Sequence, residues 1–203
     1  YAGEILRAKG EWYDSMRDGH NVIVTREPVG VVAMITPWNF PIALPAWKVA
    51  SALAFGNTMV LKPASFVPGC AVALTQALHD AGVPPGVFNL VMGDGSATGN
   101  IMIDRADALS FTGGTETGRV VLRRAAETMT KTQLELGGKN AYVILDDADL
   151  DLAIETAANG AWIQTGQRCT ATERLIVTRG VHDQVVERLA AKARAYKVGH
   201  ALD

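Results

Sequence analysis

Four apolar runs of the chain are each followed by a polar or glycine-containing turn and then by a helix-like segment. Their hydrophobicity is continuous rather than alternating, which is typical of strands buried on both faces. Strands are predicted at 29–35, 58–61, 87–91 and 108–111, and helices at 41–55, 68–81, up to about 103 and up to about 127. This order predicts an α/β fold, a Rossmann-like parallel sheet with right-handed crossovers and helices on both faces. Such sheets bind ligands at the carboxyl ends of their strands, where the polar turns fall.

The pattern changes beyond Thr130, and the stretch before the first strand differs as well. Residues 4–17 are mixed polar and aromatic and are interpreted as the tail of a helix. After Thr130 the sequence predicts strands at 132–136, 141–145 and 173–178, with amphipathic helices at 150–163 and from 181 to about 196. We therefore expect a cofactor-binding domain over 1–131 and the beginning of a second, catalytic α/β domain over 132–203. Because the chain begins with Tyr1 and ends in a helical run, it is expected to be a piece of something longer.

Composition narrows the class of protein. With 203 residues, 48% of them apolar and 20% charged, the chain can bury a real core and is not of the disordered type. The net charge of −2 gives no electrostatic reason to expect nucleic acid or an acidic membrane as partner. No apolar run approaches the roughly 20 residues that span a bilayer. The four histidines are scattered, so no metal site is expected.

The two cysteines stand in different settings. Cys70 begins an apolar helix face and is interpreted as a small buried hydrophobe. Cys169 lies in a polar, turn-like segment before a strand, which is where a nucleophile would be placed. Taken alone, a single cysteine is a weak signal. Two such different cysteines do not form a disulfide framework, which favours a reducing compartment and a cytoplasmic protein.

Three other side chains at strand ends are candidates for chemistry. Glu135, flanked by leucines and followed by two glycines, is either a solvated strand end or a general base in a buried setting. Lys62 directly follows a buried-type strand and is either solvated or able to reach ligand hydroxyls or phosphate. Asn39 offers an amide donor at an equivalent strand end, although Asn is common in turns for conformational reasons.

A glycine turn opens the fourth helix. Backbone N–H groups in the stretch 111–118 are placed to meet a phosphate. Its glycines, Gly113, Gly114 and Gly118, do not match the G-x-G-x-x-G fingerprint. The turn is informative mainly because it belongs to a fourth strand–turn–helix unit.

Together these segments resemble the aldehyde dehydrogenase superfamily. The matching stretches occur in the family's order: Pro37–Pro41, Leu61–Ser65, Phe111–Glu116, Leu134–Lys139 and Gly166–Cys169. The separation between Glu135 and Cys169, 169 − 135 = 34, is also that of the family. The resemblance covers essentially all 203 residues, whereas family members are considerably longer at both ends.

The resemblance implies oxidation of an aldehyde to a carboxylic acid with NAD or NADP. Cys169 would attack the aldehyde carbon, the Asn39 amide would stabilise the oxyanion, and Glu135 would activate water to hydrolyse the thioester. The residues implied in cofactor binding are Thr36, Pro37, Trp38, Lys62, Ala64, Ser65, Gly95, Phe111, Thr112, Gly113, Gly114, Thr117, Leu136 and Gly137.

Two residues depart from the family pattern, and several functional alternatives stay open. Ser65 stands where many NAD-preferring relatives have glutamate, so NADP becomes admissible; Gly114 stands where serine is common. The sibling alternative is a coenzyme A-acylating enzyme, against which the presence of Glu135 argues. A second alternative is a truncated fragment that binds a nucleotide but does not catalyse a reaction. A third is a structural protein that retains the fold of an enzyme for bulk or assembly. The expected partner is a small aldehyde, and the parent enzyme is expected to be a homodimer or homotetramer.

Overall fold

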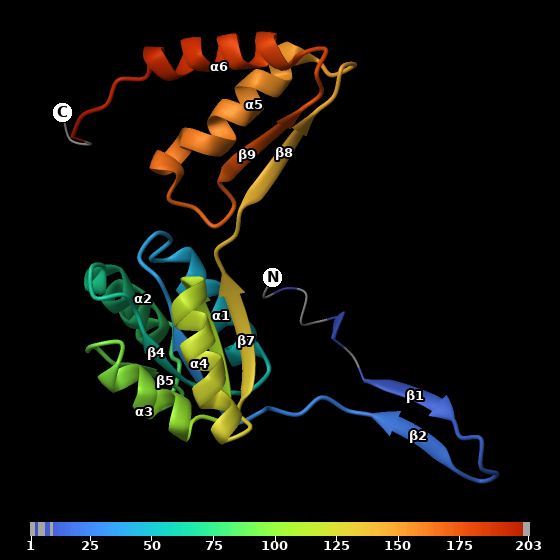
Figure 1. Cartoon of the computed structure of the whole chain (residues 1–203). Coiled ribbons are helices and arrows are strands. Elements are labelled where there is room, and N and C mark those ends of the chain that lie inside the picture. Colours follow the sequence, from blue (N-terminus) through green and yellow to red (C-terminus); the bar gives the residue numbers. More distant parts are fainter. Residues whose placement is uncertain (1–2, 4–6, 9, 201–203) are drawn as a thin grey trace. The chain divides into compact units, whose positions relative to one another are not determined.

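The structure, a computed structural model, describes residues 3, 7–8 and 10–200 (Figure 1). The chain divides into two compact units, residues 1–136 and residues 137–203, called here the first and the second unit. None of the helices in these described ranges combines the length and apolar character that crossing a membrane requires.

The first unit is built on a five-stranded parallel sheet, as the alternation of strands and helices predicted. The strands run in the order β5-β4-β3-β6-β7. Their bounds are β3 (Val31–Ile35), β4 (Thr58–Lys62), β5 (Phe88–Leu90), β6 (Ala108–Gly113) and β7 (Lys131–Leu136). The helices are α1 (Ala43–Ala54), α2 (Pro68–Asp80), α3 (Ala97–Arg105) and α4 (Thr115–Glu127). Gly56 and Gly82, which follow the ends of α1 and α2, have φ of 76° and 83°, a conformation that glycine adopts without a steric cost.

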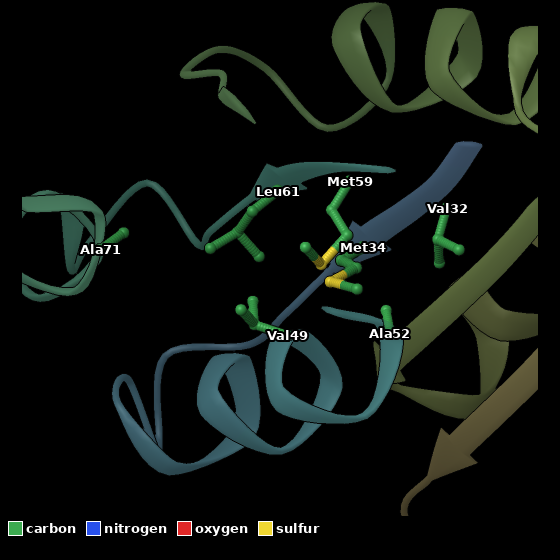
Figure 2. Close-up of a cluster of buried hydrophobic side chains, with 7 residues drawn as sticks. All are labelled: Val32, Met34, Val49, Ala52, Met59, Leu61 and Ala71. Carbon is green, nitrogen blue, oxygen red and sulfur yellow. The ribbon is translucent and has the colours of Figure 1, made fainter. Parts of the chain in front are cut away.

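Two cores lie on opposite faces of this sheet, because successive side chains of a strand point to opposite sides. On one face, Met34 and Met59 pack with Val49 of α1 and Ala71 of α2 (Figure 2). On the other face, Leu109 and Phe111 pack with side chains of α3 and α4. Each fully buried side chain of this size contributes about 1.5–3 kcal/mol relative to exposure. The strand β3 supplies both cores, which explains its continuous hydrophobic run.

The strand β7 corrects the predicted domain boundary. It pairs with β6 from Ala108↔Lys131 to Gly113↔Leu136, so residues 131–136 belong to the first sheet. The division therefore follows Leu136, not residue 131. As the edge strand, β7 alternates exposed and half-buried residues, and this pattern differs from the continuous runs of the inner strands.

The segment interpreted as a helix tail, residues 4–17, contains instead the first strand of a β-hairpin. Strands β1 (Glu11–Asp14) and β2 (Asn21–Val24) pair antiparallel, and residues 4–6 and 9 lie outside the described residues. Every residue of both strands is exposed. Aromatic and β-branched residues such as Trp12, Tyr13 and Ile23 favour the strand conformation here.

The second unit has a two-stranded parallel sheet and two helices. Its elements are β8 (Asn140–Ile144), α5 (Leu150–Trp162), a short 3₁₀ turn η2 (Ile163–Gly166), β9 (Thr172–Val177) and α6 (His182–Ala195). Ile144, Ile154 and Val185 are among its fully buried side chains. The N-cap of α5, Asp149, accepts hydrogen bonds from the backbone N–H of Asp151 and of Leu152 at 3.0 and 3.1 Å.

Candidate active site

The carboxyl ends of β3, β4 and β6 bring three separate segments to one edge of the sheet. Ile35 pairs with Lys62 and with Phe111, so the residues after these strands become neighbours. The Thr36 N–H donates to the Lys62 carbonyl oxygen over 3.2 Å. The edge thereby gathers the predicted residues of the first unit that follow these three strands: Thr36, Pro37, Trp38, Asn39, Lys62, Ala64, Ser65, Phe111, Thr112, Gly113 and Gly114.

Two threonines at this edge carry buried hydroxyls without a partner. Thr36 and Thr112 are 3% and 8% exposed, and neither Oγ1 has a hydrogen-bond partner among the described residues. A buried polar group left unsatisfied costs about 1–3 kcal/mol. Adjacent strand ends therefore present two hydroxyls that a polar ligand at this edge would satisfy.

Lys62 is buried at the same edge. Its ammonium donates to the carbonyl oxygens of Pro63 at 2.9 Å and Gly93 at 3.4 Å. Burial lowers the pKa of Lys62, and the nearby Asp94 carboxylate opposes that shift. An ammonium has three donors, so these two bonds leave it able to donate to a ribose hydroxyl or a phosphate oxygen as well. Ser65, three residues further on, is exposed.

The glycine turn before α4 has a specific steric basis. A Cβ on Gly113 would lie 2.6 Å from the Phe111 ring, and one on Gly118 would lie 2.6 Å from Leu136. Gly118 therefore allows close packing of α4 on β7. At Gly114, the N-cap of α4, a Cβ would meet nothing within 4 Å, and none of the described side chains caps the helix. The first-turn N–H groups have no carbonyl partner within the helix, and Thr117 in this turn is exposed.

The loop after β5 contains Gly95, another predicted cofactor residue. It is exposed, and a Cβ at this position would meet no described atom within 4 Å. Beside it, the Asp94 carboxylate accepts hydrogen bonds from the Ser96 hydroxyl and from the backbone N–H of Ser96 and Ala97. These bonds, the Ser96 hydroxyl first, lower the pKa of Asp94. The loop is thus shaped by Asp94, while Gly95 leaves its surface open.

Glu135 and Asn39 occupy further strand ends of the first unit. Glu135, near the end of β7, is exposed, so of the two settings left open by the sequence it has that of a solvated strand end; β7 is the edge strand of the sheet. Leu136 on the opposite face of β7 packs against the core below α4. Asn39 is half-buried in the loop after β3, and its neighbour Trp38 is 43% exposed.

Glu135 ends a chain of polar side chains that sequence reasoning missed. Lys48 of α1 donates to Ser110 on β6 and to Gln133 on β7, and Gln133 donates to Glu135. Two signals in the sequence point to it. Lys48 interrupts the apolar face of its helix, and Ser110 stands between Leu109 and Phe111 in a run otherwise apolar.

Cys169 lies in the second unit, on the loop between η2 and β9. The thiol is free and its residue is exposed, whereas Cys70, expected to be buried, is half-buried in α2. Before the loop, Gln164, Thr165 and Gly166 have φ of 58°, 55° and 71°. For the two non-glycine residues this left-handed conformation costs roughly 1–2 kcal/mol each. The strained turn redirects the chain directly after α5.

Hydrogen bonds hold the backbone on both sides of this thiol. The Arg168 guanidinium donates to the carbonyl oxygens of Asn159 and Gly160 near the end of α5, at 3.0 and 2.7 Å. The Asn140 amide, at the start of β8, donates to the carbonyl oxygens of Cys169 and Ala171 at 2.6 and 2.9 Å. Sequence reasoning missed both positioning groups, although Asn140 directly follows the matched Gly137–Lys139 stretch.

The structure brings the predicted residues together in two groups. All of them belong to the first unit except Gly137, which begins the second, and Cys169. Among the residues that the structure describes, no group of three or more His, Cys, Asp or Glu side chains is arranged to hold a metal ion.

Comparison with known proteins gives a consistent family. The model of the "Aldehyde dehydrogenase family" matches residues 1–203. A curated relative, the alpha-ketoglutaric semialdehyde dehydrogenase of Bacillus subtilis, is 41% identical over 204 residues, covering 100% of this chain and 42% of its own length.

Solved structures agree. A betaine aldehyde dehydrogenase of Staphylococcus aureus in complex with NAD+ superposes with a TM-score of 0.91 at 39% identity, over 94% of this chain and 38% of that one. An E. coli NADP-dependent enzyme gives a TM-score of 0.95 at 42% identity, over 99% and 42% of the two chains. The chain thus spans about two fifths of the length of these proteins.

Proposed function

This chain belongs to the aldehyde dehydrogenase family, and we propose that it supplies the cofactor edge, the general base and the nucleophile of an enzyme that oxidises an aldehyde to a carboxylic acid. The observation that carries the proposal is the setting of Cys169. Its residue is exposed while hydrogen bonds from Arg168 and Asn140 fix the backbone around it. A structural cysteine would be buried and inert; a nucleophile needs access and a fixed position.

The cofactor proposed for this enzyme is NAD or NADP. Of the two solved relatives above, one is in complex with NAD+ and the other is NADP-dependent. The first unit fits such a group, because its carboxyl edge offers the buried Lys62 ammonium and the Thr36 and Thr112 hydroxyls, which find no partner among the described residues. Lys62 would hold ribose hydroxyls or a 2′-phosphate, and the open N-terminus of α4 at Gly114 would face a phosphate. When bound, the cofactor supplies the acceptor for the hydride that leaves the substrate.

Each residue would then perform one part of the reaction. The Cys169 sulfur forms a bond to the aldehyde carbon, and the electron pair of the carbonyl double bond moves to oxygen. Asn39 donates its amide N–H to this oxyanion, a type of contact whose loss typically costs about 10²–10³ in rate. As the oxyanion collapses, the C–H hydrogen leaves with its electron pair and a thioester remains on Cys169. Glu135 takes a proton from water, which attacks the thioester and releases the acid and the thiolate.

The experiment that tests the nucleophile uses the full coding sequence that contains this chain. Cys169→Ala should abolish aldehyde-dependent reduction of the cofactor, because no other residue is proposed to form the covalent bond. Cofactor affinity, measured by fluorescence titration, should stay within about twofold of the parent value. Cys70→Ala is the matched control and should retain the parent rate. Appreciable oxidation by Cys169→Ala would refute the assignment.

A second variant tests the base. In Glu135→Gln the thioester should form normally but hydrolyse slowly, so one equivalent of reduced cofactor appears in a burst before a slow steady state. Rapid-mixing absorbance resolves the two phases. A steady-state rate equal to that of the parent enzyme would remove Glu135 from the mechanism.

A further inference from the structure

A continuous chain of hydrogen bonds connects helix α1 with Glu135 inside the first unit. The Lys48 Nζ donates to the Ser110 Oγ at 2.6 Å and to the Gln133 Oε1 at 3.3 Å. The Ser110 Oγ donates to the same Gln133 Oε1 at 2.5 Å, and the Gln133 Nε2 donates to the Glu135 Oε1 at 3.0 Å. Side chains of three elements, α1, β6 and β7, thus form one chain that ends at the Glu135 carboxylate.

The sheet register explains why these side chains meet. Ser110 on β6 is paired with Gln133 on β7, and the next residue but one on each strand is Thr112 paired with Glu135. Residues two apart on a strand share a face. Ser110, Gln133 and Glu135 therefore line one face of the sheet, opposite to the Leu109 and Phe111 side chains that pack against α3 and α4.

The direction of the chain follows from what each group can donate. Burial lowers the pKa of Lys48 to about 8, and the Glu135 carboxylate opposes this shift; Lys48 is still mainly an ammonium at neutral pH and can only donate. Two donors, from Lys48 and Ser110, converge on the Gln133 oxygen. The amide of Gln133 is therefore oriented with its NH₂ group toward Glu135, since the flipped orientation would place NH₂ against the Lys48 ammonium, which can only donate, and the amide oxygen against the carboxylate.

We propose that Gln133 is a positioning residue for the general base: Ser110 and Lys48 orient its amide, and the amide holds the carboxylate of Glu135 in place for water activation. This inference rests on the function proposed above. An exposed glutamate samples several rotamers, and fixing one of them increases the fraction of time that it can meet the attacking water. Stability alone does not account for the arrangement, because partial burial of an ammonium such as Lys48 is unfavourable compared with an apolar side chain of similar size.

The test measures the two half-reactions separately in the full-length enzyme. Gln133→Leu should slow the decay of the acyl-enzyme, followed by quenching and mass spectrometry, by about tenfold, since small misplacements of a reacting group have effects of this order or larger. The rate of the first burst of reduced cofactor should stay unchanged, because that step depends on Cys169. Gln76→Leu is the matched control: it removes another amide–carboxylate hydrogen bond, to Asp80 on α2, and should change neither rate.

A matched pair at Ser110 makes the test independent of how well Gln133→Leu folds. Ser110→Thr keeps the hydroxyl. Ser110→Val introduces a side chain of nearly the same shape as threonine but without the hydroxyl, so only Ser110→Val should slow acyl-enzyme decay. Equal decay rates for this pair, or an unchanged rate in Gln133→Leu, would overturn the positioning role. A parallel loss in both half-reactions would also overturn it and indicate a structural role. By contrast, absence of a Cys169-dependent burst in the unmodified enzyme would refute the proposed function itself.

Discussion

Ser65 is the single residue on which the choice between the two cofactors should depend. It is exposed after β4, three residues beyond the buried Lys62. A carboxylate here would repel a 2′-phosphate, and two like charges about 4 Å apart interact by about 1 kcal/mol even in water. Ser65→Glu should therefore weaken NADP binding by at least about fivefold and leave NAD binding nearly unchanged. Isothermal titration of both cofactors measures this.

The uncharged variant Ser65→Gln is the control, because it adds the same bulk without charge. It should preserve the ratio of the two affinities. If Ser65→Glu and Ser65→Gln weaken NADP binding equally, bulk rather than charge acts at this position, and the electrostatic interpretation is wrong.

The setting of a single residue could be predicted where it depends on the residues next to it in the chain, and not where it depends on how strands pair. Lys62 was expected at the carboxyl end of an apolar strand, either solvated or in reach of a ligand, and the structure places it at that strand end, buried. The sequence left two settings open for Glu135, solvated or buried, because choosing between them requires knowing that β7 is an edge strand. The Lys48–Ser110–Gln133 chain was missed because it depends on the register between strands 23 residues apart.

Side chains from neighbouring elements hold the loop that carries Cys169 in place, and a variant of Asn140 tests the contribution of one of them. Its amide joins the start of β8 to the carbonyl oxygens of Cys169 and Ala171. Asn140→Ala should lose about 1–3 kcal/mol of local stability, because two hydrogen bonds are removed at roughly 0.5–1.5 kcal/mol each. Hydrogen exchange of residues 166–171 should accelerate, and the first burst of reduced cofactor should slow.

The matched control for this variant is Asn159→Ala. The Asn159 amide donates to Glu155 on the same helix, and the Asn159 backbone carbonyl, which Arg168 contacts, is kept in the variant. It should leave the burst unchanged. A normal burst in Asn140→Ala would show that the remaining contacts, those of Arg168 above all, suffice to position the thiol.

At the level of elements, runs of apolar residues made the inner strands of the sheet predictable. The inner strands of the sheet have continuous apolar runs, and β3, β4, β5 and β6 lie within a few residues of their predicted positions. The prediction of a helix tail over residues 4–17 was wrong for residues 11–14, which form β1, because all residues of β1 are exposed and no burial periodicity marks them. The η2 turn was not predicted either, since left-handed Gln164 and Thr165 carry no glycine signal.

The two units of the chain differ in the size of their sheets and in how completely their apolar side chains are buried. The first has a five-stranded sheet with a core on each face. The second has only two strands in its described part, and the face turned away from its core exposes Val143, Leu145 and Ile176 by 57%, 52% and 52%. A two-stranded sheet is marginal by itself. We therefore expect the 203-residue chain to contain a stable first unit and a more labile second unit.

A thermal-shift titration of the isolated 203-residue chain with NAD and, separately, NADP tests this difference and the cofactor edge together. A ligand at 100 times its Kd stabilises the state that binds it by about 2.7 kcal/mol, which corresponds to roughly 5–10 °C in the melting temperature of a unit of this size. The shift should appear in the transition of the first unit, because Lys62, Thr36, Thr112 and Gly114 all lie there. Hydrogen exchange should show the second unit opening at lower temperature, unchanged by either ligand. If neither cofactor moves any transition, the carboxyl edge does not form a binding site within this chain, and the buried threonine hydroxyls need another explanation. If one cofactor shifts the transition further than the other at equal concentration, that difference is the cofactor preference of the unmodified chain, against which Ser65→Glu and Ser65→Gln are compared.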